Sequence, residues 1–309
     1  MSGLYLITGF LGAGKTTFLK NFIGEFPGNR IHLIVNEFGK ESVDGALLSD
    51  VGACLREISG GSVFCACRMD QFEKALEESA AEDPDVILVE ASGLSDPTGV
   101  RRLFSSAGRF PWIQYRGAVC LVDGARFPKL YATARACTRQ LAASDAALVN
   151  KADLAGEAAL AETLRLIRGQ RPDMPVAETS FGRIPQGFLQ MLHTAQESDH
   201  EDLPLVEDLT VRRITLRISE SISARELEMF IRMFAEQTFR VKGFAATRDR
   251  CAVLADCVGT AVSVAPYSGE IPPERLGVLT VLSGGKMPVR SAVAAACKWY
   301  SQYVLSAEF

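Results

Sequence analysis

Residues 9–17 of the chain, GFLGAGKTT, match the phosphate-loop pattern G-x-x-x-x-G-K-S/T. An apolar run at residues 4–8 precedes this loop, and a stretch typical of a helix, residues 18–26, follows it. In such a strand, loop and helix, the backbone N–H groups and the helix N-terminus converge on bound phosphates. A glycine-rich turn without a ligand is the alternative, and the flanking strand and helix argue against it. The pattern therefore predicts an α/β fold with a triphosphate site.

The side chains of this loop have distinct predicted roles. Lys15 is expected to reach the outer phosphates and to act in catalysis, and the Thr16 hydroxyl is expected to bind Mg²⁺. The residues predicted to contact the nucleotide here are Gly9, Gly12, Ala13, Gly14, Lys15, Thr16 and Thr17.

Composition narrows the class of protein and its partners. The 309 residues suffice for about two domains, and a hydrophobic content of 48% is ample for their cores. A formal charge of −4 and a pI near 5.6 give no electrostatic reason to expect a nucleic-acid partner. No apolar stretch approaches the ~20 residues that span a bilayer, and the phosphate loop begins too early for a cleaved signal peptide. We therefore expect a cytoplasmic protein without a membrane partner, whose eight cysteines are thiols or metal ligands.

A second strand is predicted at residues 31–35, and Asn36 and Glu37 follow it. If this strand is parallel to the first, both end at the same edge, where the ligands of open α/β sheets gather. Asn36 and Glu37 could then form a switch segment, with the Glu37 carboxylate acting in catalysis near the metal or the attacking water. A simple strand-ending turn is the alternative.

Cys65 and Cys67 form a C-x-C pair ahead of a helix predicted at residues 69–80. Two thiolates at this spacing could share one soft divalent ion such as Zn²⁺ or Co²⁺. The spacing alone is weak evidence, because a chain with eight cysteines contains about 0.2 such pairs by accident. Two buried thiols that pack as small hydrophobes are the alternative.

The apolar run at residues 86–89 is typical of a buried parallel strand, and it leads into Glu90. A carboxylate at this place in a P-loop protein supports Mg²⁺, directly or through water, and the N–H of a glycine three residues later reaches the γ-phosphate. We therefore predict catalytic roles for Glu90 and Gly93. Leu94 stands where some small GTPases have a water-orienting glutamine, so intrinsic hydrolysis should be slow.

A strand predicted at residues 146–149 leads into the sequence N-K-x-D, formed by Asn150, Lys151 and Asp153. The Asp153 carboxylate can accept hydrogen bonds from the N1–H and the exocyclic amine of guanine, a pair of donors that adenine lacks. Asn150 and the stem of Lys151 support the ring. The motif therefore predicts GTP and GDP, rather than ATP, as ligands.

The chain is predicted to contain two domains. A strand at residues 118–122 and a single helix at residues 129–141 belong to the first, which spans residues 1–195. A polar, acidic linker is predicted at residues 196–208, and a smaller α/β domain at residues 209–309. 

His193 and His200 lie in or beside this linker, close to several acids. Metal capture by these histidines is one interpretation of the segment. A solvated linker is the favoured interpretation, because the segment is polar and acidic.

In the second domain, residues 211–218 alternate like a strand. One face of the next helix is marked by Leu227, Phe230, Ile231 and Phe234. Further strands are predicted at residues 239–245, 251–254, 261–264 and 278–282, and a closing helix at residues 289–303. Cys251 and Cys257 are predicted to be packing residues.

Together these motifs resemble those of the CobW-like GTPases, which are relatives of the hydrogenase and urease nickel-insertion GTPases. The resemblance covers essentially the whole chain and includes N-E-F-G at residues 36–39 and R-V-K-G-F at residues 240–244. It implies a P-loop GTPase domain with a mostly parallel sheet flanked by helices, followed by a CobW C-terminal domain. It also implies that the protein is a metallochaperone or an activator of metal centres.

The chain departs from this family in its metal motif, G-C-x-C-C. Residues 61–65 read GSVFC, so only Cys65 of the three cysteines is kept, and Cys67 adds a thiol two residues later. A site with two thiolates could hold another metal, could hold zinc more weakly, or could recruit Glu37, Cys54 or a ligand from a partner protein. The choice between Zn²⁺ and Co²⁺ is left open.

Three functions fit these observations. The favoured one is a GTP-hydrolysing metallochaperone that delivers a divalent metal to a metal-requiring client protein. The second is a regulatory GTPase that activates a partner such as a cobalamin-dependent enzyme, a corrinoid client, with structural thiols. A small-molecule kinase is disfavoured, because N-K-x-D and the glycine after Glu90 suit a GTPase better. The client and the oligomeric state, a homodimer included, are left open by the sequence.

Overall fold

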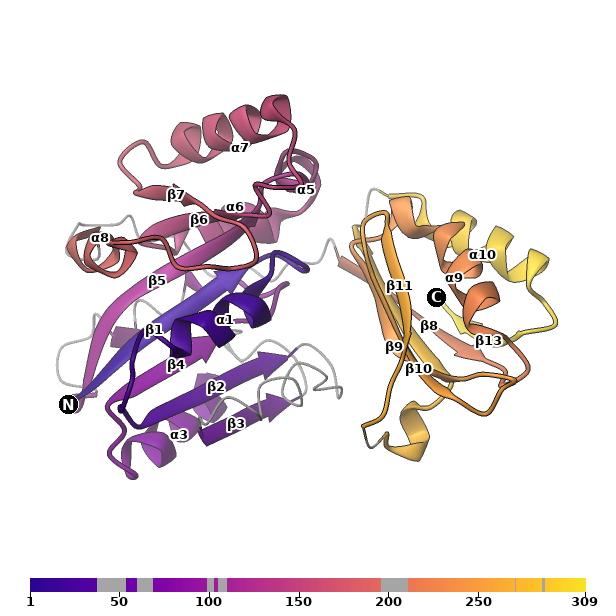
Figure 1. The fold of residues 1–309 in the computed structure, drawn as a ribbon, viewed down its shortest axis with the longest axis horizontal. Helices are drawn as coiled ribbons and strands as arrows, with labels where there is room; N and C mark the ends of the chain where they lie inside the picture. The colour runs from indigo at the N-terminus through magenta and orange to yellow at the C-terminus, as the bar shows by residue number, and fades with distance from the viewer. Residues whose placement is uncertain are drawn as a thin grey trace. The chain divides into compact units, whose positions relative to one another are not determined.

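A computed structural model describes most of the chain. The described residues are 1–37, 54–59, 69–98, 103–104, 110–195, 211–269, 271–284 and 287–309. The chain divides into two compact units, Met1–Asp208 and Leu209–Phe309 (Figure 1). The predicted linker at residues 196–208 lies outside the described residues. None of the helices in the described part is long and apolar enough to cross a membrane.

A parallel sheet forms the centre of the first unit. Within the described residues it has seven strands in the order β3-β2-β4-β1-β5-β6-β7, and every neighbouring pair is parallel. The strands are β1 (Ser2–Gly9), β2 (Ile31–Glu37), β3 (Cys54–Ser59), β4 (Val86–Glu90), β5 (Ile113–Asp123), β6 (Ala146–Asn150) and β7 (Val176–Glu178). This arrangement confirms the predicted α/β class with a mostly parallel sheet.

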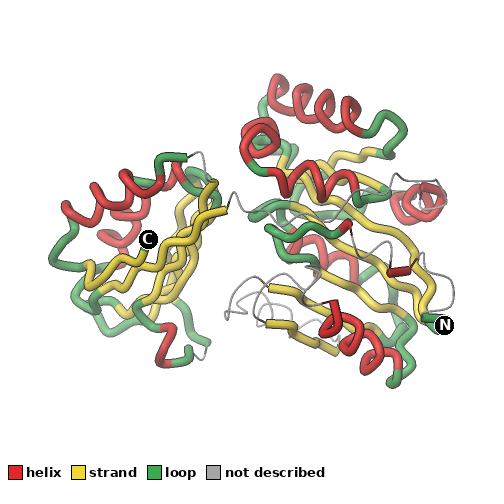
Figure 2. The backbone as a smooth tube through the Cα atoms, turned by 180° about the vertical axis from the view of Figure 1, so that it is seen from behind, coloured by secondary structure: helices red, strands yellow, loops and turns green. Residues whose placement is uncertain are grey.

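Helices cover both faces of this sheet (Figures 1 and 2). They are α1 (Lys15–Ile23), α3 (Met69–Ala80), α5 (Phe127–Thr133), α6 (Arg135–Ala142), α7 (Glu157–Gln170) and α8 (Phe188–Ala195). Alternate side chains of β1 point to opposite faces, so Tyr5 and Ile7 pack with α1 and α8, while Leu4 and Leu6 pack with α3. Burial on both faces explains why the central strands read as continuous apolar runs rather than alternating ones.

Two predicted helices of the first unit have different bounds. The helix predicted at residues 129–141 is two helices, α5 and α6, because Ala134 adopts an extended conformation with φ −122° and ψ 109°. The helix predicted at residues 18–26 begins at Lys15, directly after the left-handed Gly14, and ends at Ile23. Strands β3 and β7 and helices α7 and α8 were not predicted from the sequence.

The second unit is an antiparallel sheet with helices packed on one face (Figure 1). The described residues form six strands in the order β11-β10-β9-β12-β8-β13. These are β8 (Val211–Ile218), β9 (Arg240–Ala246), β10 (Ala252–Val258), β11 (Ala261–Pro266), β12 (Val278–Gly284) and β13 (Val304–Glu308). The helices are α9 (Ala224–Arg232) and α10 (Val289–Trp299), with short 3₁₀ helices η2 (Ala235–Gln237) and η3 (Pro273–Arg275). The smaller α/β unit is confirmed, and Leu227, Phe230, Ile231 and Phe234 all lie in its core.

Two predictions for this unit were wrong in part. Cys257 is buried on β10 as expected, but Cys251 is exposed, because it lies in the turn before that strand begins at Ala252. The closing helix ends at Trp299 rather than continuing to residue 303. The chain then adds β13, which pairs with β8.

Candidate nucleotide site

The phosphate loop joins β1 to α1 in a conformation that requires glycine. Gly9 has φ 137° and Gly14 has φ 99°, backbone angles that residues other than glycine rarely adopt. A Cβ at Gly9 would lie 2.3 Å from the carbonyl oxygen of Leu121, and a Cβ at Gly14 would lie 2.3 Å from Nδ2 of Asn150. Both the backbone angle and the lack of space for a Cβ therefore favour glycine at each of these positions.

Lys15 is buried at the start of α1, with 8% of its surface exposed. Its Nζ donates a hydrogen bond of 3.0 Å to the carbonyl oxygen of Gly9, which holds the ammonium over the loop. Thr16 is half-buried and Thr17 is exposed on the same turn. The predicted phosphate lysine and magnesium hydroxyl thus lie side by side at a helix N-terminus, where negative charge is favoured.

The guanine motif is bonded directly to the phosphate loop. Asn150, the last residue of β6, donates from Nδ2 to the carbonyl oxygen of Ala13 at 2.9 Å. Lys151 donates from Nζ to the carbonyl oxygen of Gly12 at 2.6 Å and forms a 2.8 Å ion pair with Asp123. These hydrogen bonds join residues that are more than 130 positions apart in the chain.

Asp123 is a supporting residue that the sequence analysis missed. It ends β5, has 2% of its side chain exposed, and accepts hydrogen bonds from the N–H groups of Ala125 and Arg126 as well as from Lys151. These contacts fix the ammonium of Lys151 under the loop. The motif's third residue, Asp153, is exposed beside it, where its carboxylate is accessible to a base.

A second missed element is the loop at residues 179–182, which follows β7. The N–H of Gly182 donates to Oδ1 of Asn150 at 3.0 Å, and Ser180 Oγ accepts from the N–H of Asp153 at 3.1 Å. Asn21 of α1 donates to the carbonyl oxygens of Phe181 and Gly182. This loop therefore completes the surroundings of the guanine motif. Recognition of β7 would have located it, because the carboxyl ends of parallel strands share one edge.

The end of β4 lies against the phosphate loop. Glu90 pairs in register with Ile7 of β1 and is buried, with 5% of its surface exposed. A Cβ at Gly93 would lie 2.8 Å from the backbone nitrogen of Leu11, so only glycine lets the two backbones approach this closely. Glu90 and Gly93 therefore occupy the edge where the sequence analysis expected them.

Gln140 of α6 holds this segment in place, and no sequence pattern pointed to it. Its side chain is fully buried, and its Nε2 donates to the carbonyl oxygens of Gly93 at 3.1 Å and Ser95 at 3.2 Å. Gln140 is thus a positioning residue for the turn after β4. Leu94 in the same turn is buried as well.

The predicted transition-metal residues can be placed only in part. The backbone of Glu37 ends β2 at the nucleotide edge, but its side chain, together with Cys65 and Cys67, lies outside the described residues. Cys54 pairs with His32 at the start of β3, five residues from the pairing of Glu37 with Ser59. At about 3.3 Å per residue this separates Cys54 from Glu37 by roughly 16 Å. The two cannot ligate the same ion, which excludes a site that recruits both.

His193 is engaged elsewhere. Its Nε2 lies 2.9 Å from the hydroxyl of Tyr5, and burial is the main reason that the pKa of His193 falls below its usual value. His200 lies outside the described residues. Buried cysteines pack as apolar groups, as at Cys120, where burial raises the pKa of the thiol to about 12.

Four neighbouring parallel strands, β4, β1, β5 and β6, thus deliver a phosphate loop, a buried acid and a guanine motif to one edge. This fold and this edge define the class of P-loop nucleotide-binding proteins. Residues 4–178 match the family described as CobW/HypB/UreG, nucleotide-binding domain. The chain belongs to this family, which confirms the resemblance drawn from its motifs.

Curated relatives fit this assignment. The chain is 35% identical over 159 residues to the zinc chaperone YeiR of Escherichia coli, covering 50% of this chain and 47% of that protein. It is 29% identical over 291 residues to the zinc chaperone CobW of Pseudomonas aeruginosa, covering 78% and 76%. It is 26% identical over 189 residues to the zinc-regulated GTPase metalloprotein activator 1 of Schizosaccharomyces pombe, covering 58% and 46%. The chain spans about half the length of the first and third of these relatives.

Proposed function

We propose that this protein is a GTPase metallochaperone, which couples its guanine-nucleotide state to the binding of a divalent metal and its delivery to a client protein. The observation that carries the nucleotide half is the hydrogen bond from Asn150 to the carbonyl oxygen of Ala13. It ties the guanine motif to the phosphate loop, so base recognition and phosphate binding belong to one preformed site. Preformed contacts of this kind reduce the ordering cost of binding.

The residues fit a nucleotide that carries Mg²⁺. The half-buried hydroxyl of Thr16 and the buried carboxylate of Glu90 offer oxygen ligands, the type that Mg²⁺ prefers. When bound, the ion would neutralise charge on the β- and γ-phosphates. Lys15 would hold the outer phosphates, and the N–H of Gly93 would contact the γ-phosphate.

Hydrolysis should be slow in the isolated protein. Leu94 has no polar group that could orient a water molecule, and Gln140 does not replace the missing glutamine, because its side chain is fully buried and bonded to two backbone carbonyls. Glu37 is the remaining candidate for activating the water at this edge. A client or another partner would then be needed to speed turnover.

The metal half of the proposal rests on the family and on Cys65 and Cys67. The relatives named zinc chaperones make zinc the first candidate for the cargo, and cobalt has similar ligand preferences. The thiols follow β3, whose end reaches the nucleotide edge beside β2. A ligand loop that begins there would respond to the γ-phosphate.

A second function is favoured by a specific observation. The family's metal motif keeps only Cys65 of three cysteines in this chain, and one relative is named a metalloprotein activator. A regulatory GTPase that activates a client, such as a corrinoid-dependent enzyme, would need the switch but not the cargo site.

The nucleotide assignment is tested by calorimetry with Mg²⁺. The wild type should bind GTP and should not be competed by ATP, and Lys15→Ala should lose binding. Lys20→Ala is the matched control, since Lys20 is an exposed lysine on the same helix. Equal affinity of the wild type for ATP and GTP would contradict the assignment.

A further inference from the structure

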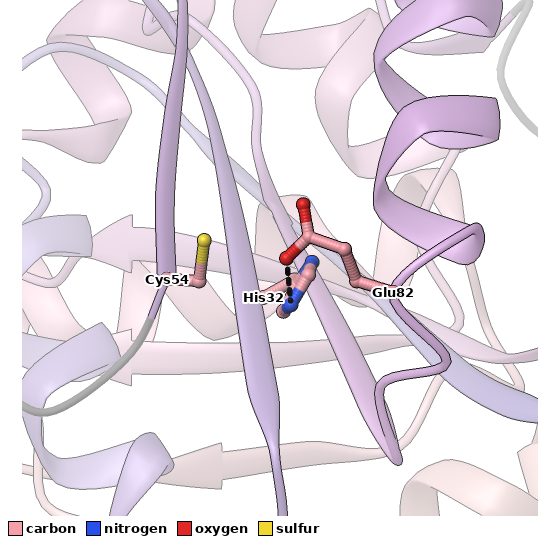
Figure 3. A group of neighbouring side chains, drawn as sticks. All are labelled: His32, Cys54 and Glu82. Atoms are coloured by element: carbon pink, nitrogen blue, oxygen red, sulfur yellow. Dashed lines mark ion pairs between the residues drawn. The ribbon is translucent and has the colours of Figure 1, made fainter.

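Three potential metal ligands from separate elements meet near the amino ends of β2 and β3, at the opposite end of the strands from the nucleotide site (Figure 3). His32 of β2 and Cys54 of β3 are register partners, so their side chains stand on the same face of neighbouring strands. Glu82 reaches them from the turn after α3. One donor atom from each residue, Nδ1 or Nε2, Sγ and a carboxylate oxygen, lies within 4.8 Å of the others. We propose that His32, Cys54 and Glu82 form a second site for a divalent transition metal of the zinc class.

The imidazole is held in the orientation that a metal needs. His32 is 6% exposed, and its Nδ1 lies 2.8 Å from the hydroxyl of Ser79, which is fully buried. With the proton on Nδ1 donated to Ser79, the lone pair of Nε2 points toward Glu82. Metal-ligating histidines are fixed in this way by a partner on the other ring nitrogen.

Glu82 is also oriented before any ion binds. One carboxylate oxygen pairs with Arg56, and the other, Oε2, lies 3.5 Å from Nε2 of His32. Arg56 also forms an ion pair of 3.3 Å with Glu78. The two glutamates and a Cys54 thiolate outnumber the cations Arg56 and Arg30 near His32, so the local charge favours a divalent cation.

The spacing fits tetrahedral zinc after a small movement. Bond lengths of about 2.0–2.3 Å place the donors of such a site roughly 3.4–3.6 Å apart. The histidine and glutamate atoms already have this separation. The sulfur of Cys54 lies within 4.8 Å of both atoms on an exposed side chain, so it has to move by at most about 1.4 Å to reach this spacing. Three protein ligands leave a fourth position for water or for a ligand from another protein.

This site is independent of the nucleotide site and of the proposed function. His32 precedes Glu37 by five residues along β2, a separation of roughly 16 Å. Metal bound here would therefore be held at the edge of the sheet away from the phosphate loop. An open coordination position and a half-exposed carboxylate suit an ion that is exchanged rather than stored.

Cobalt provides the test, because thiolate coordination to Co²⁺ gives a charge-transfer band. The full chain with Cys65→Ser and Cys67→Ser should still show this band when titrated with Co²⁺ alone. Adding Cys54→Ser should remove the band and weaken Co²⁺ binding at least tenfold, because loss of even an outer-shell partner costs about 10–100-fold in metal affinity. Adding Cys251→Ser instead, at another exposed thiol, should change neither. His32→Gln should weaken binding at least tenfold and keep a polar partner for Ser79.

Two controls make the result decisive. The circular dichroism melt of Cys54→Ser should match that of its parent, because the side chain is exposed. Lys15→Ala should lose nucleotide binding and keep the cobalt band, which separates this site from the proposed function. Absence of a thiolate band in the Cys65→Ser, Cys67→Ser protein, or its persistence after Cys54→Ser, would overturn the site.

Discussion

Asn150 shows how a single side chain joins parts of the site that lie far apart in sequence. Its amide nitrogen donates to the phosphate loop, and its oxygen accepts from Gly182. Lys151 repeats the pattern with Gly12 and Asp123. In the proposed site, Asn150 and Lys151 hold the guanine motif against the phosphate loop, and the exposed Asp153 would select the base.

Asp153→Asn should change base selectivity rather than abolish binding. Asparagine offers a donor where aspartate offers only acceptors, so the variant should prefer xanthine nucleotides, whose extra carbonyl calls for a donor. Competition calorimetry with GTP and XTP measures this. Unchanged preference for GTP would show that Asp153 does not contact the base.

Gln140→Met should damage the turn after β4. The substitution keeps the volume but leaves the buried carbonyls of Gly93 and Ser95 without this donor, so unfolding free energy should fall by about 1–3 kcal/mol. GTP hydrolysis should fall more than GDP affinity, because the N–H of Gly93 in this turn is proposed to contact the γ-phosphate. Gln170→Met, at a partly buried glutamine that also donates to a backbone carbonyl, is the control and should leave hydrolysis unchanged. Equal losses of hydrolysis in both variants would refute the positioning role.

At the scale of elements, the sequence predicted the strands and motifs that are determined by residues close together in the chain. The runs in β1, β4 and β6 are apolar because the strands are covered on both faces, and each ends in a recognisable motif. The three residues of β7 are too few to show a period, so the loop after it could not be found. A buried glutamine such as Gln140 has no local signature either. Its role depends on contacts that only the folded chain creates.

The capping box of α9 links the stability of the second unit to pH. Ser223 is the N-cap, and Glu226 accepts from both its backbone N–H and its hydroxyl. These bonds, with further ones from Arg248 and Tyr303, lower the pKa of Glu226 from 4.5 to about 2. Because the folded pKa is depressed, the stabilisation is present above pH 4.5 and is lost as the pH falls toward 2.

Glu226→Gln should therefore lower stability at neutral pH and converge with the wild type near pH 2. Urea unfolding of the full chain, followed by circular dichroism at several pH values, measures the difference. Glu228→Gln removes a surface ion pair with Arg232 in the same helix and serves as the matched control. If the loss of unfolding free energy in Glu226→Gln stays constant between pH 7 and pH 2, the charged form of Glu226 is not what stabilises the helix.

At the scale of the whole molecule, a nucleotide edge and a metal-ligand edge share one sheet. The strands β2 and β3 connect them, since His32 and Cys54 begin the pairing that Glu37 and Ser59 end. The second unit, Leu209–Phe309, adds an antiparallel sheet of its own.

Turnover by the isolated chain should fall far below the ~1 s⁻¹ low end of typical enzymes. The reason is the apolar Leu94 in the turn after β4. Single-turnover assays with GTP and Mg²⁺ measure the rate. Fast hydrolysis without a partner would reveal a catalytic group that this account lacks.

The most direct test of the account is the coupling between metal and nucleotide. Zn²⁺ affinity should be measured by chelator competition with GDP and with a non-hydrolysable GTP analogue, in a Cys54→Ser background that removes the second site. The two Zn²⁺ affinities should differ by about 5–150-fold, or 1–3 kcal/mol, and nucleotide affinity should change by the same factor when Zn²⁺ is added. Cys65→Ser with Cys67→Ser should abolish the difference. Equal Zn²⁺ affinity in the two nucleotide states would contradict the central claim and favour the regulatory GTPase.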